Sequence, residues 1–234
     1  MRLFHYAHFT HLAVIVGQLF YSVATGQEVH TQQLDNSAST QNGQHSQLEV
    51  TDFYAGSLIL MNNGIIEMSE IAEKDSDTEE VVQFAENLAE AHRQLNEKIK
   101  EFAPQVAQML PATGSATGPH NTGNVNQSQP AAFPLKQLLT IQKKAADNYQ
   151  VSSIMMLNNY QGQDFDMAFL GMQIGAHTWS LAELKALDSV GNEQFQQIVA
   201  EARSKVEQHL AEAKRLSKKF EDDQKFAGKQ ARQQ

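Results

Sequence analysis

The fold is decided by residues 84–102, FAENLAEAHRQLNEKIKEF, in which large apolar side chains recur at intervals of three and four. This spacing is the period of one face of an α-helix. His92 stands in the middle of that face. An imidazole in a helical core costs free energy unless it is hydrogen-bonded or binds a metal. The face comprises Phe84, Leu88, His92, Leu95, Ile99 and Phe102.

Two later segments combine an apolar stripe with one central histidine in the same way. The first of these stripes comprises Leu170, Ile174, His177, Leu181 and Leu184. The second comprises Phe195, Val199, Ala202, Val206, His209, Ala213, Leu216 and Phe220. One histidine on each of three helices indicates a polar cluster inside a helical bundle, where metal and ligand sites are often built from facing helices.

The apolar periodicity predicts helices over residues 51–74, 79–102, 135–160, 164–187 and 193–220, and no segment has a strand pattern. The turns at 75–78 and 189–192 are short, so the helices that flank each turn should be antiparallel neighbours. We therefore predict an all-α protein, an up-down four-helix bundle of the ferritin-like kind with one additional helix and a long disordered crossover.

Five regions are predicted along the chain. Residues 1–26 have the pattern of a signal peptide, with Arg2, an apolar run over 12–23 and small residues that place cleavage near Gly26. The alternative is an uncleaved N-terminal anchor. Polar residues 27–49 indicate a disordered spacer. The helical bundle covers 50–220, with a low-complexity crossover loop over 111–134, and a polar tail covers 221–234. We expect a periplasmic or secreted protein without integral membrane insertion after cleavage.

Composition excludes several classes of function. The net charge is −9 and the pI is about 5.4, which argues against nucleic acid as a partner. The chain has no cysteine, so disulfides, thiolate metal sites and cysteine nucleophiles are excluded. No dinucleotide-binding glycine motif, phosphate loop or G-x-S-x-G nucleophile turn occurs. The sequence shows no reaction and favours a non-enzyme.

The candidate metal ligands are His92, His177, His209 and Glu67. If both turns lie at one end of the bundle, counting about 1.5 Å per residue from them puts the three histidines within about 10 Å of one another in height, and Glu67 is the outlier. Imidazole ligands favour a transition metal such as zinc, copper or iron over magnesium or calcium. No Glu-x-x-His pair accompanies the histidines, which argues against a ferritin-type di-iron centre. In the alternative interpretation each imidazole bonds a neighbouring polar group and only fixes the packing.

Two further features lie on the helix over 164–187. Gly171 and Gly175 are one turn apart on one face, and we expect them to allow a neighbouring helix to approach closely, or alternatively to leave room for a ligand beside His177. Asp166 is expected to cap the helix or to interact with its dipole, because it lies near the helix N-terminus.

The order of these residues resembles a bacterial family of secreted helical proteins called domain of unknown function 4142. The resemblance covers about residues 50–216. It rests on Phe165-Asp166-x-x-Phe169 with His177 further on, and on Val206-Glu207-Gln208-His209-Leu210 with Ala213 and Leu216. Asp52-Phe53, Glu67, Phe84-Ala85-x-x-Leu88 and His92 match the family's first half.

This resemblance implies a four-helix, ferritin-like bundle in the bacterial envelope, without an established activity. The chain departs from the family at Ala91, where Asp usually precedes the histidine of the second helix, and in its longer linker over 114–129.

Three functions remain open. The protein binds a transition metal or small ligand through its core histidines, or it is a structural or stress-related envelope protein that meets an envelope partner or its own copies. The third function is a metal-dependent oxidase or hydrolase, for which no arrangement of carboxylate and water is visible in the sequence.

Overall fold

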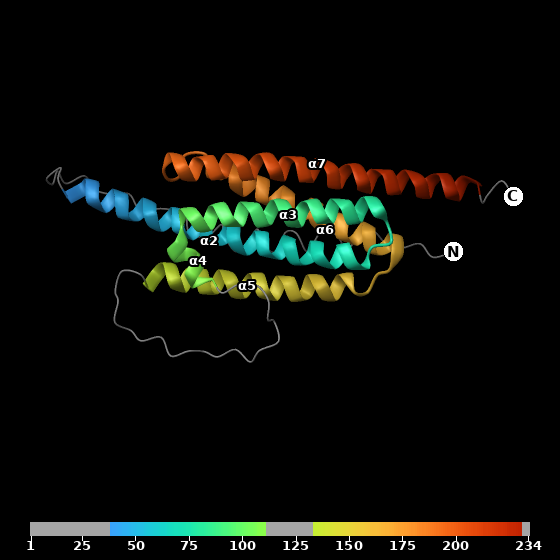
Figure 1. Ribbon diagram of the computed structural model, residues 1–234, viewed down its shortest axis with the longest axis horizontal. Coiled ribbons are helices and arrows are strands. Elements are labelled where there is room, and N and C mark those ends of the chain that lie inside the picture. Colours follow the sequence, from blue (N-terminus) through green and yellow to red (C-terminus); the bar gives the residue numbers. More distant parts are fainter. Residues whose placement is uncertain (1–37, 111–132, 231–234) are drawn as a thin grey trace, which may run out of the picture.

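The computed structural model describes residues 38–110 and 133–230, with side chains placed over 50–110 and 135–223. Within these ranges the chain forms six helices and no strand (Figure 1). The prediction of an all-α helical bundle is confirmed. The helices are α2 (Ala38–Asp75), α3 (Glu79–Phe102), α4 (Pro104–Met109), α5 (Phe133–Leu157), α6 (Gly162–Ala186) and α7 (Glu193–Gln230).

Helices α2, α3, α7 and α6 pack around a common core as two antiparallel hairpins. Tight turns join α2 to α3 and α6 to α7. Helices α3 and α7 are antiparallel neighbours, because Lys98 pairs with Glu201 near one end and Lys219 pairs with Glu80 near the other. Helix α6 lies antiparallel to α2, with Ser180 against Met61. Each helix of this group therefore has its neighbours running in the opposite direction.

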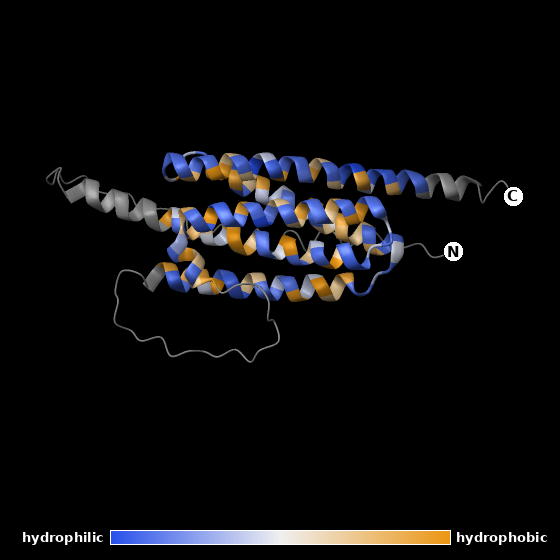
Figure 2. Ribbon diagram, in the orientation of Figure 1, coloured by the Kyte–Doolittle hydropathy of each residue, from blue (hydrophilic) through white to orange (hydrophobic). Residues whose placement is uncertain are grey.

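Helix α5 is the additional helix and packs on the outside of α2 (Figure 1). Leu139 is buried against the core, and Gln150 approaches Gly64 of α2. Figure 2 shows apolar positions along α5. Some of the apolar side chains of this helix are exposed, among them Ile141 and Met155.

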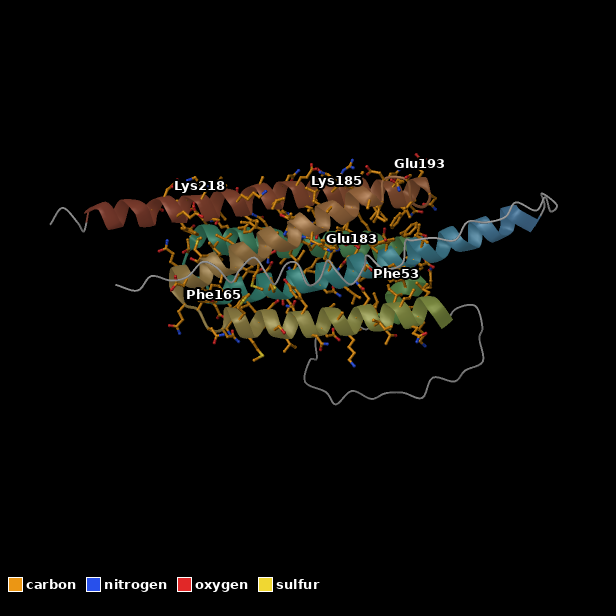
Figure 3. All side chains as sticks on the ribbon, turned by 180° about the vertical axis from the view of Figure 1, so that it is seen from behind. Phe53, Phe165, Glu183, Lys185, Glu193 and Lys218 are labelled. Carbon is orange, nitrogen blue, oxygen red and sulfur yellow. The ribbon has the colours of Figure 1, made fainter. Side chains whose placement is uncertain are left out.

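The core consists of two apolar clusters separated by a polar layer. One cluster contains Leu58, Ile99 and Phe195, and the other contains Phe84, Phe169 and Leu216. Phe53 belongs to the first and Phe165 to the second, and Figure 3 shows them toward opposite ends of the bundle. All four helices contribute polar residues to the layer between the clusters: Asn62, His92, Asn96, Gln173, His177 and His209.

Several predicted boundaries are wrong. Helix α2 begins at Ala38 and not near residue 51, so residues 38–49 of the predicted spacer are helical. Helix α7 reaches Gln230, well into the predicted tail. The short helix α4 was not predicted; Pro104 at its start fits there because proline has no N–H to leave unpaired. Residues 1–37, with the predicted signal peptide, and most of the crossover, 111–132, lie outside the described residues. None of the described helices combines the length and the apolar character that a membrane crossing requires.

The expectation that Gly171 and Gly175 permit close helix packing is wrong. A Cβ atom added at either position would meet nothing within 4 Å. The glycine that does allow close approach is Gly56 of α2, where an added Cβ would lie 2.5 Å from Leu139 Cδ2 and 3.1 Å from Val106 Cγ1.

Alanine at these glycines should therefore act in opposite directions. Gly171→Ala should raise the free energy of unfolding by about 0.5–1 kcal/mol, because Gly171 is an exposed position inside a helix. Gly56→Ala should lower it by about 1–3 kcal/mol, because the core must shift to admit the methyl group. Urea denaturation of both variants tests this, and a loss of stability in Gly171→Ala would show that its face is covered.

Candidate metal centre

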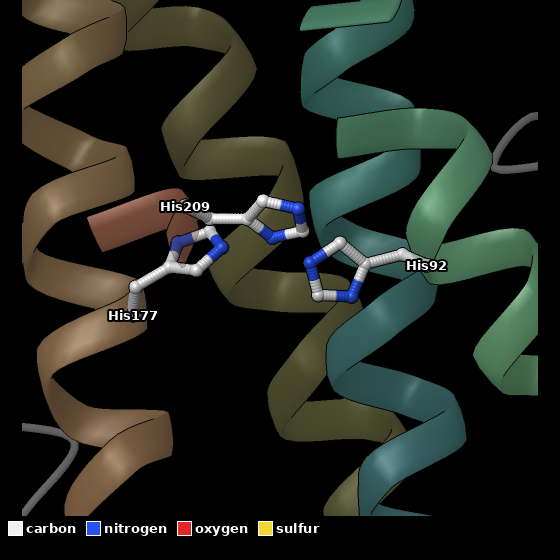
Figure 4. A group of neighbouring side chains, drawn as sticks. All are labelled: His92, His177 and His209. Carbon is white, nitrogen blue, oxygen red and sulfur yellow. The ribbon is translucent and has the colours of Figure 1, made fainter. Parts of the chain in front are cut away.

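Three histidine rings from three helices meet in the polar layer (Figure 4). His92 comes from α3, His177 from α6 and His209 from α7. The ring centroids are 5.3 Å apart for His92 and His209, 5.4 Å for His177 and His209, and 5.6 Å for His92 and His177. Each ring offers one nitrogen, and these three nitrogens lie within 4.8 Å of one another.

A chain of asparagine amides fixes the tautomer of His92. Its Nδ1 lies 2.8 Å from Asn62 Oδ1. Asn62 Nδ2 donates to Asn96 Oδ1 at 2.8 Å, and Asn96 Nδ2 donates to Asn63 Oδ1 at 2.8 Å. Because Asn62 uses its oxygen as the acceptor, the proton of His92 resides on Nδ1. The lone pair is then on Nε2, which is buried and has no hydrogen-bond partner.

His177 is oriented in the same manner by its own helix. Its Nδ1 donates to the backbone carbonyl of Gln173 at 2.9 Å, and its buried Nε2 has no partner. For His209 the buried and unpartnered atom is Nδ1. A metal-bound histidine typically donates its second ring N–H to a carbonyl or carboxylate, which sets the tautomer and the ring orientation. His92 and His177 have this arrangement.

Burial keeps all three imidazoles neutral near pH 7. It is the main reason that the pKa of His177 and that of His209 are lowered to about 4; for His209 the neighbouring His177 and Lys205 contribute to the same lowering. Burial, followed by the proximity of His177 and His209, holds the pKa of His92 well below 6.5. A histidine binds a metal as neutral imidazole, so no proton has to leave these three rings before a metal binds near pH 7.

The same pKa values predict that the metal-free protein loses stability in mild acid. Between pH 6.5 and about 4 the unfolded chain binds more protons than the folded chain, so the free energy of unfolding falls as the pH falls through this window. For His177 alone the shift corresponds to about 3 kcal/mol. Urea denaturation at several pH values should show this decline, with a shallower slope in His177→Leu. Parallel pH profiles would show that His177 does not titrate in this range.

The spacing of the nitrogens is compatible with a bound ion. Three atoms no more than 4.8 Å apart share a point within about 2.8 Å of each, and imidazole–metal bonds are about 2.0–2.1 Å. Each ring would therefore move inward by less than about 1 Å. None of the described carboxylates belongs to the group.

An open groove between α3 and α7 leads from the surface to His209. Its volume is about 380 Å³, and its walls include Glu90, Ala91, Lys205 and Glu212. His92 and His177 are 1 % and 0 % exposed, whereas His209 is only partly buried. His209 is thus the member of the group that borders solvent.

Glu67, the fourth predicted ligand, is not in this group. It is half-buried on α2, and burial raises its pKa, with smaller contributions from Glu70 and from Asp147 of α5. The presence of Asp147 shows that Glu67 lies on the side of α2 that meets α5.

Asp166 does not cap α6, as its sequence position had indicated, because the N-cap is Gln161 and makes no side-chain cap. The Asp166 carboxylate is fully buried and accepts hydrogen bonds from Ser76 Oγ, at 2.6 Å, and from Thr78 Oγ1. These hydrogen bonds connect the start of α6 to the turn between α2 and α3. They therefore help to fix the position of His177 along the bundle axis relative to His92.

Sequence reasoning missed the residues that surround the histidines. Asn62 and Asn96 are 0 % and 3 % exposed, and Gln173 is 0 % exposed. Each stands at a core position of its helix, as the histidines do. A search for any polar residue on an apolar stripe, rather than for histidine alone, would have found Asn96 beside Leu95 and Ile99.

The chain belongs to the family described as a domain of unknown function (DUF4142), whose sequence model matches residues 36–216. The match includes all three histidines and both hairpins. Comparison with curated proteins gives no match, and neither does comparison with solved structures.

Proposed function

We propose that this protein binds one transition-metal ion, zinc, copper or iron, through His92, His177 and His209. The observation that carries the proposal is the convergence of three unpartnered ring nitrogens in the core. Leaving buried polar atoms unpaired costs about 1–3 kcal/mol each, and a bound ion would remove that cost. Glu67 is left out of the proposed ligand set.

We further propose that the protein acts in the bacterial envelope, in the periplasm or outside the cell. The signal-like residues 1–26 support this location. In the periplasm or outside the cell, imidazole is a more durable metal ligand than a thiol, because thiols are readily oxidised in these compartments. The absence of cysteine from the chain fits this reasoning. An envelope partner or a second copy of the chain would use surfaces other than the buried histidines.

The competing function is a structural envelope protein whose histidines only pack. Calorimetric titration of the metal-free chain with Zn²⁺, and with Cu²⁺ in parallel, separates the two. We expect one strong site per chain, weakened at least about 100-fold in His177→Leu. Glu67→Gln is the matched control and should retain the affinity. Equal titration curves for the parent chain and His177→Leu would favour the packing function.

A further inference from the structure

Unpartnered polar atoms in the core extend beyond the three histidines. Among the described residues, eight buried side-chain nitrogen and oxygen atoms lack a hydrogen-bond partner. Three are the histidine nitrogens. Three more are both polar atoms of the Gln173 amide and the hydroxyl of Ser69. Both side chains are 0 % exposed. A helical serine can usually bond the carbonyl four residues earlier, but Ser69 does not.

The packing of α2 against α6 places Ser69 opposite Gln173. Ser76, the first residue after α2, contacts Asp166 of α6, and the two helices are antiparallel. Seven residues back from Ser76 is Ser69, and seven residues on from Asp166 is Gln173. The contact between Met61 and Ser180 gives the same register to within one residue. Ser69 and Gln173, which both carry unpartnered atoms, thus belong to one region of the core.

This region adjoins the histidine cluster. Gln173 precedes His177 by one helical turn, about 6 Å along the axis. Helical side chains lean toward the N-terminus of their own helix, so Gln173 and His177 lean in the same direction, and the His177 ring reaches back toward the level of the Gln173 backbone. Because α2 runs in the opposite direction, Ser69 leans toward the level of the histidines. Helix α7 carries Ala213 one turn after His209, and this small side chain is fully buried.

The charge of an ion bound by the three histidines also favours a fourth ligand. Three neutral imidazoles leave the full charge of a divalent ion uncompensated in the core, since none of the described carboxylates belongs to the group. A zinc-type ion with three protein ligands completes its coordination with water or another small ligand. Metal-bound water readily loses a proton, which offsets part of the charge. Such a ligand needs hydrogen-bond partners among the side chains around it.

We propose that Gln173 and Ser69 hold a water molecule or hydroxide ion that is the fourth ligand of the metal. The Gln173 amide supplies a donor and an acceptor, and the Ser69 hydroxyl supplies a third hydrogen bond. A buried water typically makes about three such bonds. The metal centre is therefore of the open type, in which small anions can replace the oxygen ligand. This inference rests on the proposed metal-binding function.

Cobalt(II) is a suitable probe, because its visible spectrum reports the ligands directly. The full chain is loaded with Co²⁺ and titrated with azide. The variants are Gln173→Leu and Ser69→Ala. Gln150→Leu is the matched control, because Gln150 is a second buried glutamine with an unpartnered Nε2 but lies on α5 beside Gly64.

We expect the parent chain to bind one Co²⁺ and to change its spectrum with azide. Gln173→Leu should bind Co²⁺ about 10–100-fold more weakly, the usual effect of losing a residue that hydrogen-bonds to a metal ligand. Its affinity for azide should fall at least about tenfold, while Gln150→Leu behaves as the parent. Ser69→Ala removes one oxygen only, and should weaken azide binding in the same direction if Gln173→Leu does not fold.

Two results would overturn the inference in distinguishable ways. If Gln173→Leu and Ser69→Ala match the parent in both cobalt and azide affinity, the fourth ligand is not held by these residues, and the histidine site stands. If the parent chain takes up no Co²⁺, Zn²⁺ or Cu²⁺, the proposed function fails and the fourth ligand fails with it.

Discussion

Zinc added to the metal-free chain should raise its free energy of unfolding by about 4 kcal/mol when the free metal concentration is 1,000 times the dissociation constant. For a chain of this size that gain corresponds to roughly 10 °C in melting temperature. The gain arises because the folded state presents three neutral imidazoles at one point, whereas the unfolded chain presents them far apart. Differential scanning calorimetry with and without Zn²⁺ measures it.

His177→Leu distinguishes metal binding from packing in the same experiment. Without metal, the variant should be at least as stable as the parent, because the substitution removes a buried nitrogen that has no partner. With metal, it should lose most of the zinc-dependent gain. A variant that is destabilised without metal and keeps the full gain with metal would contradict the assignment of His177 as a ligand.

The second large effect is expected at Asp166. Asp166→Ala should lower the free energy of unfolding by about 3–5 kcal/mol, because it removes two hydrogen bonds to a charged acceptor, each contributing about 1.5–3 kcal/mol. It also leaves the hydroxyls of Ser76 and Thr78 without this acceptor at the junction of α2, α3 and α6. Urea denaturation at pH 7 gives the value.

Asp164→Ala is the matched control for this prediction. Asp164 lies in the first turn of α6, two residues before Asp166, and is exposed, so its interaction with the helix dipole contributes only about 0.3–1 kcal/mol. Equal losses in the two variants would mean that Asp166 acts through the helix dipole, as its sequence position alone had indicated, and not through the turn.

The histidines were predictable from sequence because each interrupts an apolar stripe that is otherwise clear. The stripe of α3 is the best example, since Leu88, Leu95 and Ile99 around His92 are all buried. Helix α2 was harder. Met61 and Met68 are seven residues apart, a helical spacing, but the innermost residues of α2 include Asn62 and Ser69, each one position further along. An apolar residue directly precedes each of these two polar residues in the sequence, so the apolar pattern did not indicate that Asn62 and Ser69 are buried.

Helix α6 was ambiguous for a related reason. It is apolar around most of its circumference, so periodicity alone did not fix which side faces the core. The expected stripe included Ile174 and Leu181, which are only partly buried, whereas Gln173 and Ser180 are fully buried. The role of Asp166 depends on a contact with residues about 90 positions earlier. The sequence around Asp166 does not indicate this contact.

The meeting of the three rings also depended on tertiary structure. Counting residues from the turns placed the histidines within about 10 Å in height on the assumption that both turns lie at one end of the bundle. That assumption is wrong: Asp166 at the start of α6 contacts Ser76 in the first turn, whereas Gly191 in the second turn lies beside Thr51, so the two turns are at opposite ends. The stagger between the hairpins is set by contacts such as that of Asp166 with Ser76 and that of Lys98 with Glu201. Glu67 was included because it followed the apolar pattern, but α5 packs against that side of α2.

The most direct test of the central claim is the metal content of the chain purified without an affinity tag. The chain has nine histidines, so a variant that lacks His92, His177 and His209 keeps six and controls for adventitious binding. We predict one equivalent of zinc, copper or iron in the parent chain and none in the triple variant. Equal metal content in the two proteins, or no metal in the parent even after reconstitution, would contradict a metal centre formed by these histidines.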